Sequence, residues 1–253
     1  MTRAWLWPNL LSLDAPLVAV LWQILFARCF HAEVTPTAAV LLVLAVWLIY
    51  AADRIFDARG KSKLPRHEFY RRNWRVVAPV WIAGLGTAGW LAWTRLSSDL
   101  FERGMLLAAA VGLYFALVHL APPRSWPKEA AVAVLFALGA SLTTWGQVRS
   151  PVDVATILLF SCLCWINCAA IEKWERRDAR WPVGFAAICV AAAAAVVFCM
   201  QRPVLGSAEG LSAVAFVMLD RAGSRFSRDA LRVLADVALL SPIFFLPIAG
   251  TLA

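Results

Sequence analysis

Two acidic residues four positions apart, Asp53 and Asp57, end a long apolar stretch that runs from Thr37 to Ala52. On a helix, positions i and i+4 share one face, so both carboxylates are expected to point at one place. Mg²⁺ takes carboxylate oxygens from proteins and is commonly shared with phosphate oxygens. Basic residues lie among and after these acids: Arg54, Arg59, Lys61, Lys63, Arg66, Arg71, Arg72 and Arg75. The pattern predicts a site for a Mg²⁺-bound phosphate or diphosphate.

The elements that must position these residues are membrane spans. The chain has 253 residues, of which 62% are hydrophobic and 16% are charged, and it contains 13 Trp. This composition is typical of a polytopic membrane protein rather than a soluble one. Because apolar stretches recur with no soluble block between them, we expect a single membrane domain over residues 1–253.

Nine apolar stretches are candidate spans, and most approach the roughly 17 to 25 residues that a helix needs to cross hydrocarbon. They are Ser12–Phe30, Thr37–Phe56, Val76–Trp93, Gly104–Ala121, Ala130–Trp145, Val154–Ile171, Trp181–Met200, Glu209–Leu219 and Ala230–Ala249. The eighth is too short to span by itself, so it is either a half-helix or is extended by Pro203–Ser207. The predicted fold class is an all-α integral membrane protein of about nine transmembrane helices.

The distribution of Lys and Arg predicts the orientation. Of the 24 Lys and Arg residues, 19 lie at the N-terminus or in the even-numbered connections. Cytoplasmic loops carry the excess of positive charge, so the N-terminus is expected inside and the C-terminus outside, in a bacterial inner (cytoplasmic) membrane. Residues 57–75 and 172–181 would be cytoplasmic cap loops. Topology thus explains the net charge of +8, and we expect no nucleic-acid partner.

Polar residues gather at the predicted cytoplasmic ends of the spans. They are Asp14, Asp53, Asp57, His119, Lys128, Glu129, Asn167, Glu172 and Asp236. Ionisable groups inside a membrane are costly and usually face a cavity or a partner. Together they predict a central cavity open to the cytoplasm, although any one of them is equally well explained as an ordinary helix-end residue.

This order of features resembles that of the UbiA-type intramembrane prenyltransferases. In that family nine helices surround a central cavity, acidic motifs close the second and sixth helices, and cytoplasmic loops cap the cavity. The first motif, N-D-x-x-D-x-x-x-D, corresponds to Ile49–Asp57, which keeps the last two acids and has Ile49-Tyr50 in place of Asn-Asp. Pro127–Gly139 is similar to the family's fifth helix, which opens with a basic residue and reaches a Leu-Gly pair.

The second family motif, D-x-x-x-D, would fall in Ile166–Asp178, where Glu172 and Glu175 stand at i and i+3. The resemblance implies Mg²⁺-dependent transfer of a prenyl group from an isoprenyl diphosphate to a small or lipid-pathway acceptor in the bilayer. Asp53, Asp57, Glu172 and Glu175 would be the catalytic metal ligands. The expected substrate-binding residues are Arg59, Lys61, Arg66, Arg71, Arg72, Lys128 and Asn167.

Other functions stay open. A CDP-alcohol phosphotransferase also uses acids at the membrane edge, but only the fragment Asp57-Ala58-Arg59 of its D-G-x-x-A-R pattern is present. A small-molecule transporter would fit a charged chamber, although the chain has no inverted repeat. A divergent UbiA-like protein that binds a lipid phosphate without turning it over would fit the altered motifs. The prenyl chain length, the acceptor and the oligomeric state do not follow from the sequence.

Overall fold

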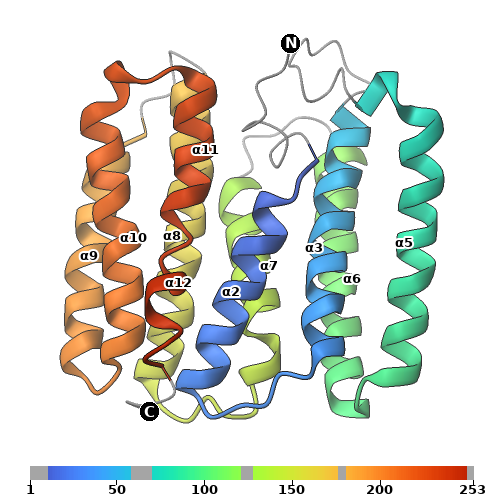
Figure 1. Cartoon of the computed structure of the whole chain (residues 1–253), viewed down its shortest axis with the longest axis horizontal. Coiled ribbons are helices and arrows are strands. Elements are labelled where there is room, and N and C mark those ends of the chain that lie inside the picture. Colours follow the sequence, from blue (N-terminus) through green and yellow to red (C-terminus); the bar gives the residue numbers. More distant parts are fainter. Residues whose placement is uncertain (1–10, 58–69, 121–127, 176–180, 250–253) are drawn as a thin grey trace. The chain divides into compact units, whose positions relative to one another are not determined.

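The structure is a computed structural model that describes residues 11–57, 70–120, 128–175 and 181–249 (Figure 1). These residues are almost entirely helical and include no strand, which confirms the predicted all-α class. The chain divides into two compact units. Unit 1 takes Met1–Val20 and Thr35–Pro122, and unit 2 takes Leu21–Val34 and Pro123–Ala253. Helix α2 (Asp14–Cys29) contributes its first part to unit 1 and its second part to unit 2.

Unit 1 contains three long apolar helices, α3 (Pro36–Asp57), α5 (Trp74–Arg95) and α6 (Ser98–Leu120). Helices α3 and α5 lie antiparallel (Figure 1), and the Trp81 indole nitrogen donates a hydrogen bond to the Leu48 carbonyl at 2.9 Å. A Cβ atom on Gly84 would lie 3.4 Å from the Leu48 and Trp47 side chains, so the missing side chain lets the two helices approach closely.

Unit 2 contains the remaining helices. They are α7 (Lys128–Ser141), α8 (Pro151–Glu175), α9 (Val183–Cys199), α10 (Pro203–Ala222), α11 (Arg228–Ala238) and α12 (Pro242–Phe245), with 3₁₀ turns η2 (Leu142–Thr144) and η3 (Gly223–Arg225). A Cβ atom on Gly206 would lie 2.6 Å from the Ala194 carbonyl oxygen, so only glycine permits this contact between α9 and α10. The core includes Trp22 stacked on Phe160 at 4.2 Å between ring centroids.

Two of the predicted spans need comment. Helix α10 begins at Pro203, which confirms the alternative in which Pro203–Ser207 extends the eighth predicted span. The ninth, Ala230–Ala249, is wrong as a single helix, because the chain is interrupted at residues 239–241 between α11 and α12. Pro242 explains the interruption, since proline has no N–H to donate and disfavours helical geometry in the residue before it.

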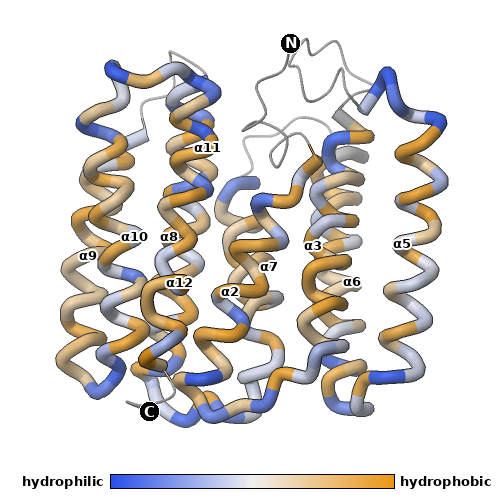
Figure 2. The backbone as a smooth tube through the Cα atoms, in the orientation of Figure 1, coloured by the Kyte–Doolittle hydropathy of each residue, from blue (hydrophilic) through white to orange (hydrophobic). Residues whose placement is uncertain are grey.

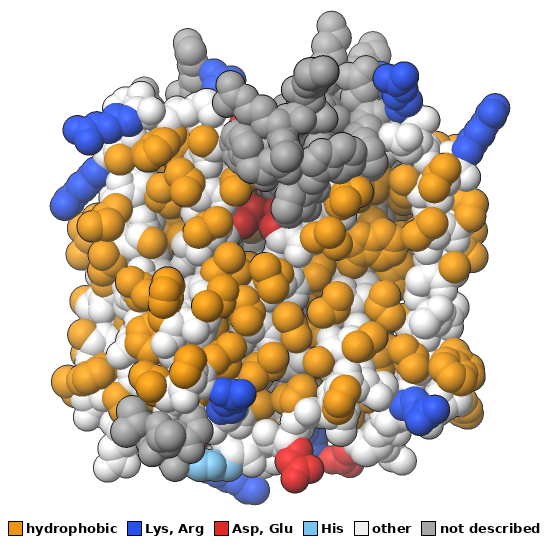
Figure 3. All heavy atoms as spheres, viewed as in Figure 1, with side chains coloured by type: hydrophobic (Ala, Val, Ile, Leu, Met, Phe, Trp, Pro, Cys, Tyr) orange, Lys and Arg blue, Asp and Glu red, His pale blue; other side chains and the backbone are white. Residues whose placement is uncertain are grey.

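Five helices of the described part are long and apolar enough to cross a membrane: Pro36–Phe56, Trp74–Arg95, Ser98–Val118, Pro151–Glu175 and Pro203–Arg225. Val183–Cys199 is a shorter apolar helix. Figure 2 shows apolar residues along the helices and hydrophilic residues mainly toward their ends, and Figure 3 shows apolar side chains exposed on the surface in view. These features support a membrane protein, while the count of nine spans, the orientation and the central cavity stay predictions.

Candidate functional site

The candidate site is the last two turns of α3 in unit 1. Helix α3 continues without interruption to Asp57, so positions 53 and 57 are one helical turn apart, as the sequence predicts. Asp53 is half-buried, and the side chain of Asp57 lies outside the described residues. Helix α3 has 22 residues and is apolar for most of its length, and both acids lie in its final two turns.

Arg54 is the unexpected member of this site. Its side chain is only 7% exposed, and neither Nε nor Nη1 has a hydrogen-bond partner among the described residues. Two buried guanidinium nitrogens without partners are costly, because their N–H groups have lost water and gained no acceptor. Such a group is suited to an anionic ligand, and its planar fork matches two phosphate oxygens at once. Arg54 belongs to the basic run of the sequence but is not among the predicted site residues.

The other predicted basic residues of the first cap loop contribute little to the geometry described. Arg71 and Arg72 are exposed just ahead of α5. Arg59, Lys61 and Arg66, with most of residues 57–75, lie outside the described residues. Next to Arg71, the buried Tyr70 places its hydroxyl 3.2 Å from Ser12 Oγ.

The second acidic pair stands at the end of α8 in unit 2. Glu172 accepts a hydrogen bond from the Trp181 indole nitrogen at 2.9 Å, and Glu175 forms an ion pair with Arg232 at 3.2 Å. Both acids lie within α8, at the i and i+3 spacing that was expected. Residues 176–180 of the predicted second cap loop lie outside the described residues. The two contacts connect α8 to the start of α9 and to α11, which gives both carboxylates a packing role.

The two remaining predicted site residues also belong to unit 2. Asn167 donates a hydrogen bond from Nδ2 to Asp236 at 3.1 Å, which joins α8 to α11. Lys128 is exposed at the start of α7, with its Nζ 3.9 Å from Glu129. Within the described ranges, no group of three or more His, Cys, Asp or Glu residues is arranged to hold a metal ion. The ligands predicted for Mg²⁺ at the end of α3 are the carboxylate oxygens of Asp53 and Asp57, a ligand type that Mg²⁺ accepts.

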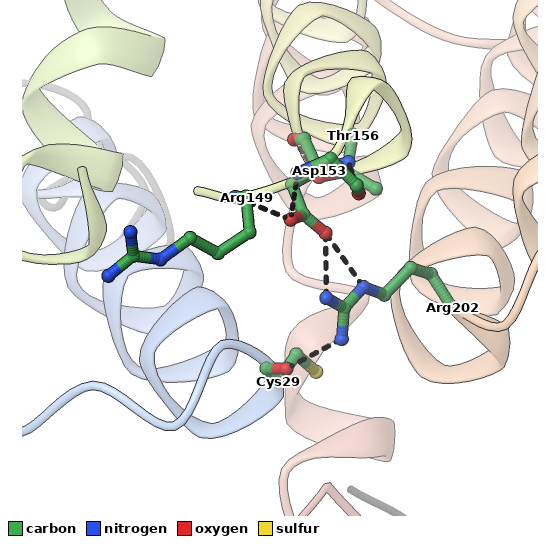
Figure 4. A network of polar contacts seen from close by, with 6 residues as sticks. Cys29, Arg149, Asp153, Thr156 and Arg202 are labelled. Atoms are coloured by element: carbon green, nitrogen blue, oxygen red, sulfur yellow. Dashed lines mark hydrogen bonds and ion pairs between the residues drawn. The ribbon is translucent and has the colours of Figure 1, made fainter. Parts of the chain in front are cut away.

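A different polar network, which the sequence analysis did not predict, joins the start of α8 to α2 and α10 (Figure 4). Arg202 approaches Asp153 with Nε at 2.9 Å and Nη2 at 2.7 Å, and it donates from Nη1 to the Cys29 carbonyl at 3.1 Å. The other Asp153 oxygen accepts from the backbone N–H groups of Arg149 and Ser150, both at 3.0 Å. This network has the spacing and completeness of a structural ion pair.

Comparison of the chain with protein-family models, with curated proteins and with solved structures finds no match. The resemblance to UbiA-type prenyltransferases therefore rests on the residues of this chain alone.

Proposed function

We propose that the chain is a divergent UbiA-like membrane enzyme. It binds an isoprenyl diphosphate at the cytoplasmic end of α3 and transfers the prenyl group to a small or lipid-pathway acceptor. The observation that carries the proposal is the set of residues in the final turns of α3: Asp53 and Asp57 stand one turn apart, with the buried guanidinium of Arg54 between them in sequence. Acids for a metal and a cation for a phosphate are thus offered by one short segment.

Each of these residues has a distinct task in the proposed reaction. The carboxylates of Asp53 and Asp57 would hold Mg²⁺, whose contribution when bound is to neutralise charge on the diphosphate. Arg54 would donate to phosphate oxygens and stabilise the negative charge that the leaving diphosphate gains as its bond to the prenyl carbon breaks. The acceptor supplies the electron pair for the new bond and releases a proton. The apolar length of α3 would keep the prenyl chain in hydrocarbon.

A second candidate function is the binding of a lipid phosphate without transfer. The contacts of Glu172 with Trp181 and of Glu175 with Arg232 favour it, because both acids of the second motif already serve packing. In that case the α3 residues would still hold the phosphate, while no bond of the ligand would break.

The test is binding of isoprenyl diphosphates of several lengths to the detergent-purified full chain, with and without Mg²⁺. Wild type is compared with Asp53→Asn and with Arg95→Met, whose exposed arginine in the last turn of α5 serves as a charge-removal control. We expect Mg²⁺-dependent binding that Asp53→Asn weakens by about 100-fold and Arg95→Met leaves unchanged. Release of diphosphate when candidate acceptors are added distinguishes transfer from binding alone. Failure to bind any isoprenyl diphosphate contradicts the proposed transfer.

A further inference from the structure

Glu209 is the most deeply buried acid of unit 2 without a partner. It lies two turns into α10, a helix apolar and long enough to cross a membrane, and its side chain has no exposed surface. Neither carboxylate oxygen accepts a hydrogen bond from any described residue. A bare carboxylate is expensive in an apolar interior, so Glu209 is expected to be neutralised by a bound proton or by another bound cation.

The nearest basic residue along the chain cannot balance it. Arg202 precedes Glu209 by seven positions, and its guanidinium is already held by Asp153 and by the Cys29 carbonyl (Figure 4). No ion pair involving Glu209 occurs among the described residues, although ion pairs of other acids do. A mobile cation is the partner that remains. One carboxylate matches one positive charge, whereas divalent ions usually gather further acidic ligands.

Neutral oxygen donors stand one helical turn away. Ser212 follows Glu209 by three positions on the buried face of α10, and its hydroxyl lies 2.8 Å from that of Ser241. Both serines are buried. Hydroxyl and backbone carbonyl oxygens beside an interrupted membrane helix are the ligands by which membrane proteins hold small monovalent cations.

The break between α11 and α12 lies beside Ser212 of α10, because it contains Ser241. Ser241 is the last residue of the break between α11 and α12, and Pro242 deprives the Ala238 carbonyl of the N–H that a continuous helix would offer it. The Trp22 indole nitrogen donates to the Leu239 carbonyl at 2.9 Å, and the neighbouring Gln23 is buried with its Oε1 unpaired. Irregular backbone at membrane depth is tolerated where it is buried in protein or lines a functional cavity.

We infer that Glu209 is the centre of an exchangeable site for a singly charged cation inside unit 2, supported by the hydroxyls of Ser212 and Ser241. A proton and Na⁺ carry the same charge and would compete for the carboxylate. The inference is independent of the proposed prenyl transfer, since it uses none of the residues of α3.

The experiment is thermal unfolding of the detergent-purified full chain across pH, in NaCl or in choline chloride at equal ionic strength. If the folded chain holds a proton on Glu209 that the unfolded chain releases, stability falls as pH rises, because the folded state then binds more protons than the unfolded state. Na⁺ would restore the lost stability at high pH by binding the folded state. Glu209→Gln should remove both dependences, whereas Glu102→Gln, at an exposed position on α6, should keep them.

The outcomes separate the two cations. A pH dependence that disappears in Glu209→Gln, with no effect of Na⁺, assigns the site to a proton, and a Na⁺ effect that disappears with it assigns the site to Na⁺. Identical dependences in wild type and Glu209→Gln overturn the inference. Should that variant fail to fold, the wild-type chain is treated with an apolar carbodiimide, which adds to a protonated buried carboxyl. Labelling of Glu209 that falls with rising pH or with Na⁺ supports the site, and labelling insensitive to both overturns it.

Discussion

Two arginines of this chain, Arg202 half-buried and Arg54 buried, have opposite surroundings. Arg202 is bound by Asp153 and by the Cys29 carbonyl, and Asp153 is in turn held by two backbone N–H groups. Arg54 is more deeply buried, and neither its Nε nor its Nη1 meets a partner in the described part of the chain. A charge with every bond made holds helices together, whereas a buried charge with bonds unmade is suited to a ligand. Arg202 therefore serves the fold, and we propose that Arg54 serves ligand binding.

The largest expected effect comes from breaking the satisfied network. Arg202→Met leaves Asp153 buried and without its cation, so we expect the free energy of unfolding to fall by about 3 kcal/mol. Unfolding of the full chain in detergent measures this loss. Arg149→Met is the control, because only the backbone N–H of Arg149 binds Asp153. Equal stability of Arg202→Met and wild type would contradict the structural role of the network.

Asp53→Asn tests the opposite region. We expect Mg²⁺-dependent affinity for an isoprenyl diphosphate to fall by about 100-fold, as is usual when a metal ligand or its close support is lost. The free energy of unfolding should change by less than about 1 kcal/mol, since Asp53 is half-buried at a helix end. Calorimetric titration with and without Mg²⁺ measures the first quantity. Unchanged affinity would remove Asp53 from the site.

Arg54→Met sharpens the comparison, because it should behave unlike Arg202→Met. Replacing a buried, unpaired charge by an apolar side chain of similar length should leave the free energy of unfolding equal to or above that of wild type. Diphosphate affinity should fall about 10-fold or more, through loss of charge-assisted hydrogen bonds. The pair of unfolding curves and the binding titration are the measurements. A loss of stability as large as that in Arg202→Met would mean that Arg54 serves the fold.

The smallest effect is expected at the second acidic pair. Trp181→Phe removes the hydrogen bond to Glu172 and should cost about 1 kcal/mol of stability. Diphosphate affinity should stay within about twofold of wild type if Glu172 serves packing. Diphosphate affinity that falls by much more than twofold in this variant would instead support the metal-ligand role that the family resemblance implies for Glu172.

Hydrophobic patterning was sufficient to predict the all-helical class and the long apolar helices. Long apolar stretches place α3, α5 and α8 within about four residues of their observed bounds, because length and polarity alone define such helices. Pattern reasoning missed the interruption before Pro242, where an apolar run continues through a proline that ends one helix and starts another. Pro242 itself indicates a helix break, but the apolar residues on both sides of it favour one continuous span.

The site was less predictable, because sequence shows residue type but neither burial nor bonding. The spacing of Asp53 and Asp57 predicts that they lie on one helix face, because positions i and i+4 are one turn apart. Arg54 is not among the predicted site residues. Its position between the two acids, on the helix and not in the loop after it, does indicate that it lies beside them. The sequence shows Glu209 only as the first residue of a short apolar stretch, because residue type does not distinguish a paired acid from an unpaired one.

A Mg²⁺-diphosphate site at the end of α3 is tested most directly by titration of the wild-type chain and of Asp53→Asn with an isoprenyl diphosphate, in Mg²⁺ and in a chelator. We expect wild type to bind only when Mg²⁺ is present, and Asp53→Asn to bind about 100-fold more weakly than wild type in Mg²⁺. Binding that is equal with and without Mg²⁺, or equal in the two proteins, would contradict a Mg²⁺-diphosphate site at the end of α3.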